Sequence, residues 1–98
     1  MGSSNIREKS IEQKLVREVR QRGGLCLKFV SPGFDGVPDR IVLMPEGRMA
    51  FVEVKAPGRK PERLQTARHE MLRRLGFKVY VLDRAEQIGG VIDAIRTT

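Results

Sequence analysis

The sequence is short of cysteine, tryptophan and long apolar stretches. Its one cysteine, Cys26, cannot form an intramolecular disulfide, and its apolar neighbours predict a place in the core. No apolar run approaches the roughly 20 residues of a spanning helix, and no apolar segment follows the charged start as in a secretory signal. We therefore expect no membrane partner. We also expect residues 1–9 to be flexible, with Met1 to Ser4 in part a cloning tag.

Several catalytic and cofactor-binding patterns are absent as well. The sequence has no glycine-rich phosphate loop, no zinc-ligand spacing, and no serine or cysteine nucleophile with a matching histidine. The only histidine, His69, falls in the middle of an expected helix, and we expect it at the surface and not as a metal ligand. These absences argue against nucleotide-loop, zinc and covalent-nucleophile chemistry.

Positive charge is what the sequence has in excess. It contains 19 lysines and arginines against 12 aspartates and glutamates, a formal net charge of +7. Such a balance favours a polyanionic partner, with nucleic acid ahead of a membrane surface. A chain of 98 residues can bury one modest core. We therefore expect a single domain over residues 1–98.

Hydrophobic periodicity predicts helices that alternate with short strands. Ser10 and Gln13 form a capping-box pattern, Pro61 suits the first turn of a helix, and Asp83 with Glu86 suits a third helix start. The expected helices are Ile11 to Arg22, Pro61 to Leu75 and Ile88 to Ile95, and the expected strands are Leu25 to Val30, Asp39 to Met44, Met49 to Lys55 and Phe77 to Leu82. The second helix is expected to bury Leu64, Ala67, Met71, Leu72 and Leu75.

These elements predict an α/β fold of order αβββαβα, with a mixed four-stranded sheet flanked by helices. The second and third strands should form an antiparallel hairpin, with Gly47 at positive φ in the turn. The fourth strand should run parallel to the third or lie near it, because a helix connects them.

Charged side chains gather at one end of the expected hairpin. Side chains alternate along a strand, so Glu53 and Lys55 point to the same face. Asp39 heads the antiparallel neighbour and should lie beside them. Two carboxylates suit Mg²⁺ or Mn²⁺, which take one or two carboxylates, waters and substrate phosphate. A lysine could then orient or deprotonate a water, or offset charge on the phosphate.

Other interpretations of these residues stay open. Glu53 and Lys55 alone could be a solvated ion pair on an edge strand, which contributes little to stability. Gln65 lies seven residues before Leu72, so it can face partly inward in the second helix. Glu12 lies beside the apolar stripe of the first helix, where it could serve the site or be a first-turn acid favoured by the helix dipole.

Two segments, "GVPDRIVLM" and "AFVEVKAPGRKPERLQ", resemble the VRR-NUC family (virus-type replication-repair nuclease), a branch of the PD-(D/E)xK nuclease superfamily. The resemblance covers most of the chain from Glu12 to Val81. Its Pro-Asp-Arg, Glu-x-Lys and downstream Gln motifs occur in the family's order. It implies a restriction-endonuclease-like core, which agrees with the element order above.

The resemblance also implies roles for individual residues. Asp39 and Glu53 would hold the divalent metal, Mg²⁺ or Mn²⁺, with the backbone carbonyl of Val54, and Lys55 would serve the attacking water. The full catalytic set implied is Asp39, Glu53, Lys55, Gln65 and Glu12, the last two as supporting members.

Basic residues flank the expected site. They could grip DNA phosphates, although each could equally be part of a solvated surface. The candidates are Arg40, Arg59, Lys60, Arg63, Lys14 and Arg17. Phe34, in the loop "SPGFDG", could stack on a base or wedge a junction, or could fill the core.

These features together predict a Mg²⁺- or Mn²⁺-dependent endonuclease that acts as a homodimer on branched DNA such as a four-way (Holliday) junction. Single-domain members of the family are associated with phage and bacterial genomes, so we expect a cytoplasmic location in a bacterial or phage-infected cell. The alternatives are a flap nuclease, a restriction-type or RNA-cleaving enzyme, and a non-catalytic nucleic-acid-binding module.

Overall fold

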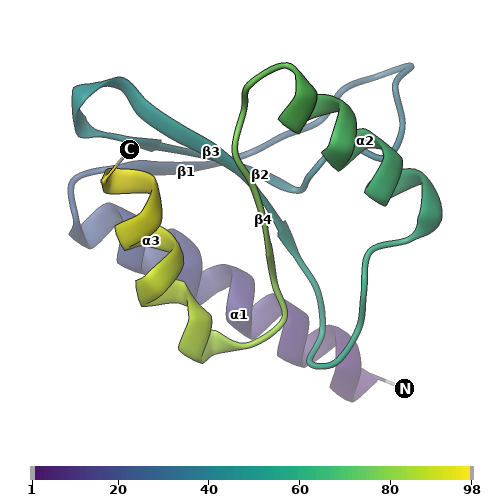
Figure 1. The fold of residues 1–98 in the computed structure, drawn as a ribbon. Helices are drawn as coiled ribbons and strands as arrows, with labels where there is room; N and C mark the ends of the chain where they lie inside the picture. The colour runs from purple at the N-terminus through teal and green to yellow at the C-terminus, as the bar shows by residue number, and fades with distance from the viewer. Residues whose placement is uncertain (1, 98) are drawn as a thin grey trace.

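The computed structural model describes residues 2–97, with side chains from Arg7 onward, and has the predicted element order (Figure 1). The helices are α1 (Gly2–Gln21), α2 (Arg63–Arg74) and α3 (Ile88–Arg96), and the strands are β1 (Leu25–Lys28), β2 (Arg40–Met44), β3 (Arg48–Val54) and β4 (Val79–Leu82). Two short 3₁₀ turns, η1 (Pro45–Gly47) and η2 (Ala85–Gln87), complete the chain. Among the described residues, no helix is both long enough and apolar enough to span a bilayer.

The four strands form one mixed sheet in the order β1-β2-β3-β4. The β2–β3 pair is an antiparallel hairpin and β3–β4 is parallel, which confirms both predicted pairings. Gly47 has a φ of 74° in the hairpin turn, as predicted, and Glu46 beside it has a φ of 71°. β1 ends at Lys28, earlier than predicted, because Lys28 pairs with Arg40, the first residue of β2.

The core lies between one face of the sheet and the helices α1 and α3. Every second residue of β3 points into it, so Val52 and Val54 are buried there. The cluster consists of Ile11, Leu15, Val19, Cys26, Val42, Met44, Ala50, Val52, Val54, Leu82, Ile88, Ile92 and Ile95. Cys26 is therefore a core residue, as predicted. Figure 1 shows α2 on the opposite side of the sheet from α1 and α3.

The predicted start of the first helix is wrong, because α1 begins at Gly2 and not at Ile11. Ser10 lies inside the helix and is exposed. An exposed serine in a helix costs only a few tenths of a kcal/mol relative to better helix formers, so a capping-box pattern need not begin a helix. Residues 2–9, which we placed before the helix, are thus helical; Met1 lies outside the described residues.

The start of α2 and the cap before α3 also differ from the prediction, whereas α3 begins at Ile88 as predicted. α2 begins at Arg63, with Glu62 as its N-cap, so Pro61 precedes the helix. Before α3, the side chain of Gln87 accepts hydrogen bonds from the backbone N–H groups of Asp83 (3.0 Å) and Arg84 (3.3 Å). The predicted cap by Asp83 and Glu86 is therefore wrong, because the Asp83 carboxylate turns instead to the loop after β3 and accepts from the Gly58 N–H at 3.3 Å.

The predicted apolar face of α2 is largely exposed. Leu64 is 45 % exposed and Leu75 is 68 % exposed, whereas Met71 and Leu72 are half-buried. The one residue of α2 that is buried is His69. The prediction is wrong here because the helix turns a polar column toward the sheet, where it meets Glu53.

Candidate active site

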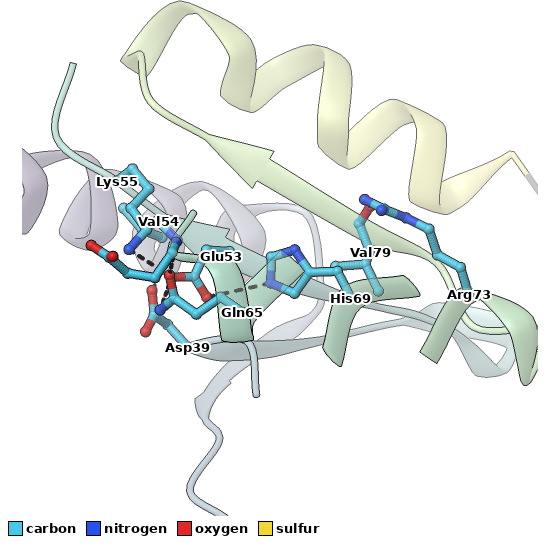
Figure 2. Close-up of polar contacts among 9 residues, drawn as sticks. Asp39, Glu53, Val54, Lys55, Gln65, His69, Arg73 and Val79 are labelled. Carbon is cyan, nitrogen blue, oxygen red and sulfur yellow. Dashed lines mark hydrogen bonds and ion pairs between the residues drawn. The ribbon is translucent and has the colours of Figure 1, made fainter. Parts of the chain in front are cut away.

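The hairpin places the predicted charged residues together at one end of the sheet (Figure 2). Arg40 pairs with Val52 across the strands, so Asp39 is level with Glu53. The Asp39 Oδ2 atom accepts a hydrogen bond from the Val54 backbone N–H at 2.9 Å. The Lys55 Nζ atom lies 3.3 Å from Glu53 Oε2. Strand alternation and the tight turn therefore bring these side chains together as expected.

Glu53 is the buried centre of this cluster. Its side chain is 1 % exposed. Oε2 accepts a hydrogen bond from Gln65 Nε2 at 2.9 Å and meets Lys55. Oε1 is buried and has no hydrogen-bond partner in the part of the chain that the structure describes. A buried carboxylate with one oxygen left unpaired is costly, because it has lost water without full compensation.

Burial and the charge of Asp39 raise the cost of ionising Glu53. Burial raises the pKa of Glu53 to about 7, and the negative charge of Asp39 adds to this rise, while Lys55 opposes it. Burial also raises the pKa of Asp39, against the lowering effect of the hydrogen bond from Val54. Raised carboxyl pKa values at one site are typical of functional clusters. A cation held between them would offset the repulsion.

The start of α2 positions Gln65. Its Oε1 accepts from the Glu62 backbone N–H at 2.8 Å, which closes the capping box, and its Nε2 donates to Glu53. The amide is therefore oriented at both ends. The prediction that Gln65 faces inward is confirmed by this contact.

His69 contradicts the prediction that it lies at the surface, since it is 2 % exposed. Its Nε2 atom lies 3.7 Å from Glu53 Oε1. Burial and the nearby positive charges of Arg73 and Lys55 lower the pKa of His69, so the imidazole is neutral at pH 7 and the contact is not an ion pair. A sequence signal was present: His69 lies four residues after Gln65, in the same helical column.

Glu12 lies behind the cluster and binds Arg40. Arg40 Nε donates to Glu12 Oε2 at 2.7 Å, and Arg40 also donates to the Cys26 carbonyl at 3.3 Å. The charge of Glu12 contributes to the raised pKa of Asp39, which places Glu12 within electrostatic reach of the site. Arg40 is thus occupied by protein partners, unlike a free phosphate-binding arginine.

The remaining candidates for DNA contact differ in their surroundings. Arg59, Lys60 and Arg63 are exposed in and just after the loop that follows β3, beside the cluster. On α1, Arg17 is exposed, whereas Lys14 Nζ lies 3.6 Å from Glu18. Arg59, Lys60 and Arg63 therefore lie between Lys55 and Gln65 in the sequence, whereas Lys14 and Arg17 belong to α1.

Phe34 does not fill the core, because its side chain is 40 % exposed. The guanidinium of Arg68 lies 3.9 Å above its ring, and Arg68 Nε donates to the Asp35 carbonyl at 2.8 Å. Gly36 lies against α2, where an added Cβ would come within 2.9 Å of Leu64. The loop is thus held on α2 with the ring of Phe34 accessible.

The donor set suits a hard divalent cation. Asp39 and Glu53 lie level on neighbouring strands with raised pKa values, and a cation between them would offset the cost of ionising Glu53. The described residues hold no group of three or more His, Cys, Asp or Glu side chains that could bind a metal. A site of two carboxylates, a backbone carbonyl, waters and substrate phosphate does not need such a group. The residues present therefore fit Mg²⁺ or Mn²⁺.

Comparisons with known proteins identify the family of this chain. A model of the VRR-NUC domain matches residues 31–85, which include the hairpin, Gln65 and His69. The phage protein "Putative nuclease p44" of Acyrthosiphon pisum secondary endosymbiont phage 1 is 51 % identical over 90 residues, 92 % of this chain and 96 % of that protein. A solved VRR_NUC domain superposes with a TM-score of 0.83 at 31 % identity, over 89 % of this chain and 95 % of that one. The chain therefore belongs to the VRR-NUC family of nuclease domains.

Proposed function

We propose that this nuclease domain is a Mg²⁺- or Mn²⁺-dependent endonuclease that hydrolyses phosphodiester bonds in branched DNA, with four-way junctions as its preferred substrate. One observation carries the proposal: the buried Glu53 carboxylate has Asp39 near it and Lys55 Nζ at 3.3 Å. A carboxylate pair with a lysine at the end of a sheet, on a basic domain, suits metal-assisted attack on a polyanion.

Each residue of the cluster has a defined part in this proposal. Asp39, Glu53 and the Val54 carbonyl would hold the cation, which when bound would stabilise the negative charge that develops on the phosphate. Lys55 orients or deprotonates the attacking water. Gln65 fixes the Glu53 carboxylate through its 2.9 Å hydrogen bond. The products would carry a 5′-phosphate and a 3′-hydroxyl.

Two exposed features would bind the DNA. The basic residues Arg59, Lys60 and Arg63 are exposed between Lys55 and Gln65 in the chain and would contact DNA phosphates near the cleaved bond. The accessible ring of Phe34, held by Arg68, would stack against an unpaired base at a branch point. Glu12 supports the site by holding Arg40.

A homodimer would supply the two active sites that a four-way junction needs. The sheet face away from the core exposes apolar side chains on β1 and β2: Leu25 is 49 %, Leu27 45 % and Leu43 38 % exposed. Leu25 pairs directly with Leu43, so these side chains adjoin. β1 is an edge strand of the sheet. These exposed leucines on and beside an edge strand support an interface in which the same surface of two copies of the chain meets. The phage origin of the relative supports activity in the cytoplasm of an infected bacterial cell.

The test is cleavage of a panel of labelled substrates: a four-way junction, a flap, linear duplex, single-stranded DNA and RNA. Each is incubated with Mg²⁺, Mn²⁺ or EDTA, using the wild type, Lys55→Ala and the matched control Lys78→Ala. Lys78 precedes β4 at the end of the sheet away from Glu53, so its removal should leave cleavage intact.

We expect metal-dependent cutting of the junction, reduced about 100- to 10,000-fold in Lys55→Ala while junction binding persists. Cutting in EDTA would contradict the metal proposal. Binding without cutting in any metal would leave the non-catalytic module, and equal cutting of linear duplex or RNA would favour the restriction-type or RNA-cleaving alternatives.

A further inference from the structure

His69 and Glu53 place two unpaired polar atoms opposite each other in the interior. His69 Nε2 and Glu53 Oε1 are 3.7 Å apart, and both are buried without a hydrogen-bond partner among the residues that the structure describes. This separation is longer than a hydrogen bond, and the pair would close with an approach of about 0.5 Å. Unpaired buried polar atoms are costly, so these atoms have reason to pair with each other.

Two neighbours of His69 on the same side of α2 hold its imidazole toward the sheet. Gln65, one turn before His69, donates to Glu53 Oε2 at 2.9 Å. Arg73, one turn after His69, donates to the Val79 carbonyl at 2.9 Å, and Val79 pairs with Phe51 two residues before Glu53. Figure 2 shows these side chains in sequence along the helix, with His69 pointing toward Glu53. The imidazole is thus held between two anchors on the same strand pair.

We propose that His69 is a positioning residue for Glu53: its Nε2–H donates to Oε1 and fixes the plane of the carboxylate that serves the divalent cation. This inference rests on the proposed function, because the position of the carboxylate matters for holding a cation. With Gln65 on one oxygen and His69 on the other, the carboxylate would be oriented before the metal arrives.

The surroundings supply the form of histidine that this role needs. The imidazole is buried with Nε2 facing the carboxylate, and a histidine ring carries at least one N–H that it can place on this nitrogen. Partners that hydrogen-bond a metal-ligating group orient it and commonly change metal affinity about 10- to 100-fold when removed. A merely space-filling histidine would have no such effect.

Metal binding tests the proposal without DNA or turnover. Mn²⁺ affinity is measured by isothermal titration calorimetry for the wild type, His69→Gln and His69→Leu, with Thr66→Ala on the exposed side of α2 as a matched control. Glutamine keeps an N–H donor near the Nε2 position, and leucine fills the space without one. Urea unfolding of each variant reports whether the fold is kept.

We expect His69→Leu to weaken Mn²⁺ binding about 10- to 100-fold and His69→Gln to stay within about threefold of the wild type. Equal affinity of His69→Leu and the wild type would overturn the proposal. Equal losses in both variants would also overturn it, because they would indicate a direct ligand or a packing role.

A second readout reports on the His69–Glu53 contact itself and needs no metal. His69 is the only histidine, so its ring nitrogens are assigned directly by ¹⁵N NMR. We expect the neutral Nε2–H tautomer and a shifted Nε2 signal in Glu53→Gln; the Nδ1–H tautomer, or an unchanged signal, would contradict the contact. A wild type that shows this tautomer but binds no Mn²⁺ would refute the proposed metal chemistry and leave the His69–Glu53 contact standing.

Discussion

The two faces of the sheet bury different kinds of side chain. Against α1 and α3, side chains such as Val52 and Ile92 are wholly buried and apolar. Against α2, the most buried side chains are Glu53 and His69, while Leu27 and Leu75 of the same side remain exposed. Phe51, which also faces that side, packs in an aromatic row with Phe29 and Phe77 at centroid separations of 5.4 and 5.8 Å.

The difference indicates that one face mainly stabilises the fold and that the other mainly holds the candidate active site. The α1/α3 face supplies most of the free energy of folding, since apolar burial is the main favourable contribution. The α2 face keeps an ionisable pair out of water, which opposes folding, and so its arrangement is explained by chemistry more than by stability. Variants that act on one face and not the other can break or sharpen this distinction.

The largest effect should come from the apolar face. Ile92→Ala removes a fully buried side chain and should lower the free energy of unfolding by about 2 to 5 kcal/mol. Leu75→Ala, at a site that is 68 % exposed on the other side, should change it by about 0.5 kcal/mol or less. Urea unfolding measures both, and equal losses at the two sites would contradict this difference between the faces.

The next effect concerns pH and the buried carboxylate. The pKa of Glu53 is raised from its ordinary 4.5 to about 7. Between these values the folded protein holds a proton that the unfolded chain has released. The free energy of unfolding should therefore fall as pH rises from about 4.5 to about 7, by on the order of 3 kcal/mol, and level off above.

Glu53→Gln should remove most of this slope, because glutamine does not titrate. The remaining slope would come from Asp39, whose raised pKa acts in the same direction, and from His69, whose lowered pKa acts in the opposite direction. The measurement is urea unfolding in EDTA at several pH values. A wild-type stability that rises over this interval would show that the carboxylate is better stabilised when charged than the burial implies.

A smaller effect should come from the exposed apolar side chains. Leu27→Glu should weaken the proposed dimer about tenfold or more, because a leucine buried at an interface contributes about 1.5 to 3 kcal/mol. Leu64 on α2 is 45 % exposed, as is Leu27, so Leu64→Glu is the matched control. Light scattering across a concentration series reads the change. A dimer that weakens only in Leu64→Glu would move the interface to α2.

The smallest effect concerns the charges around the site. Arg59→Ala should reduce the slope of log affinity for DNA against log salt by about 1, because one phosphate contact is lost. Arg96, exposed at the end of α3, lies away from the candidate active site, and Arg96→Ala should leave the slope unchanged. Fluorescence anisotropy at several salt concentrations measures both, and equal changes would indicate a diffuse charge effect.

The element order and the Asp39, Glu53 and Lys55 cluster could be predicted from the sequence because they depend on local rules. Strand alternation and a tight hairpin determine which side chains share a face and which ends meet. The predicted caps at Ser10 and Asp83 are wrong because a capping pattern is only a local preference. A longer helix overrides it at Ser10, and the competing partner Gln87 overrides it at Asp83.

The burial of His69 could not be predicted in the same way. Apolar periodicity favoured the Leu64 to Leu75 face of α2, yet which face packs depends on the sheet beneath it. There the carboxylate of Glu53 lies against Gln65 and His69 of α2. The signal lay in their shared helical column, and it becomes decisive only once the strand beside it is known.

The most direct test of this difference between the faces compares urea unfolding of the wild type and Glu53→Gln at pH 8, each in EDTA and in Mn²⁺. In EDTA, Glu53→Gln should be at least as stable as the wild type, because it lacks the buried charge. Mn²⁺ at about 100 times its dissociation constant should stabilise the wild type by about 2.7 kcal/mol and leave Glu53→Gln almost unchanged. A Glu53→Gln variant that is less stable in EDTA, or that gains as much from Mn²⁺ as the wild type, would contradict the claim that this carboxylate is kept for a metal at the expense of stability.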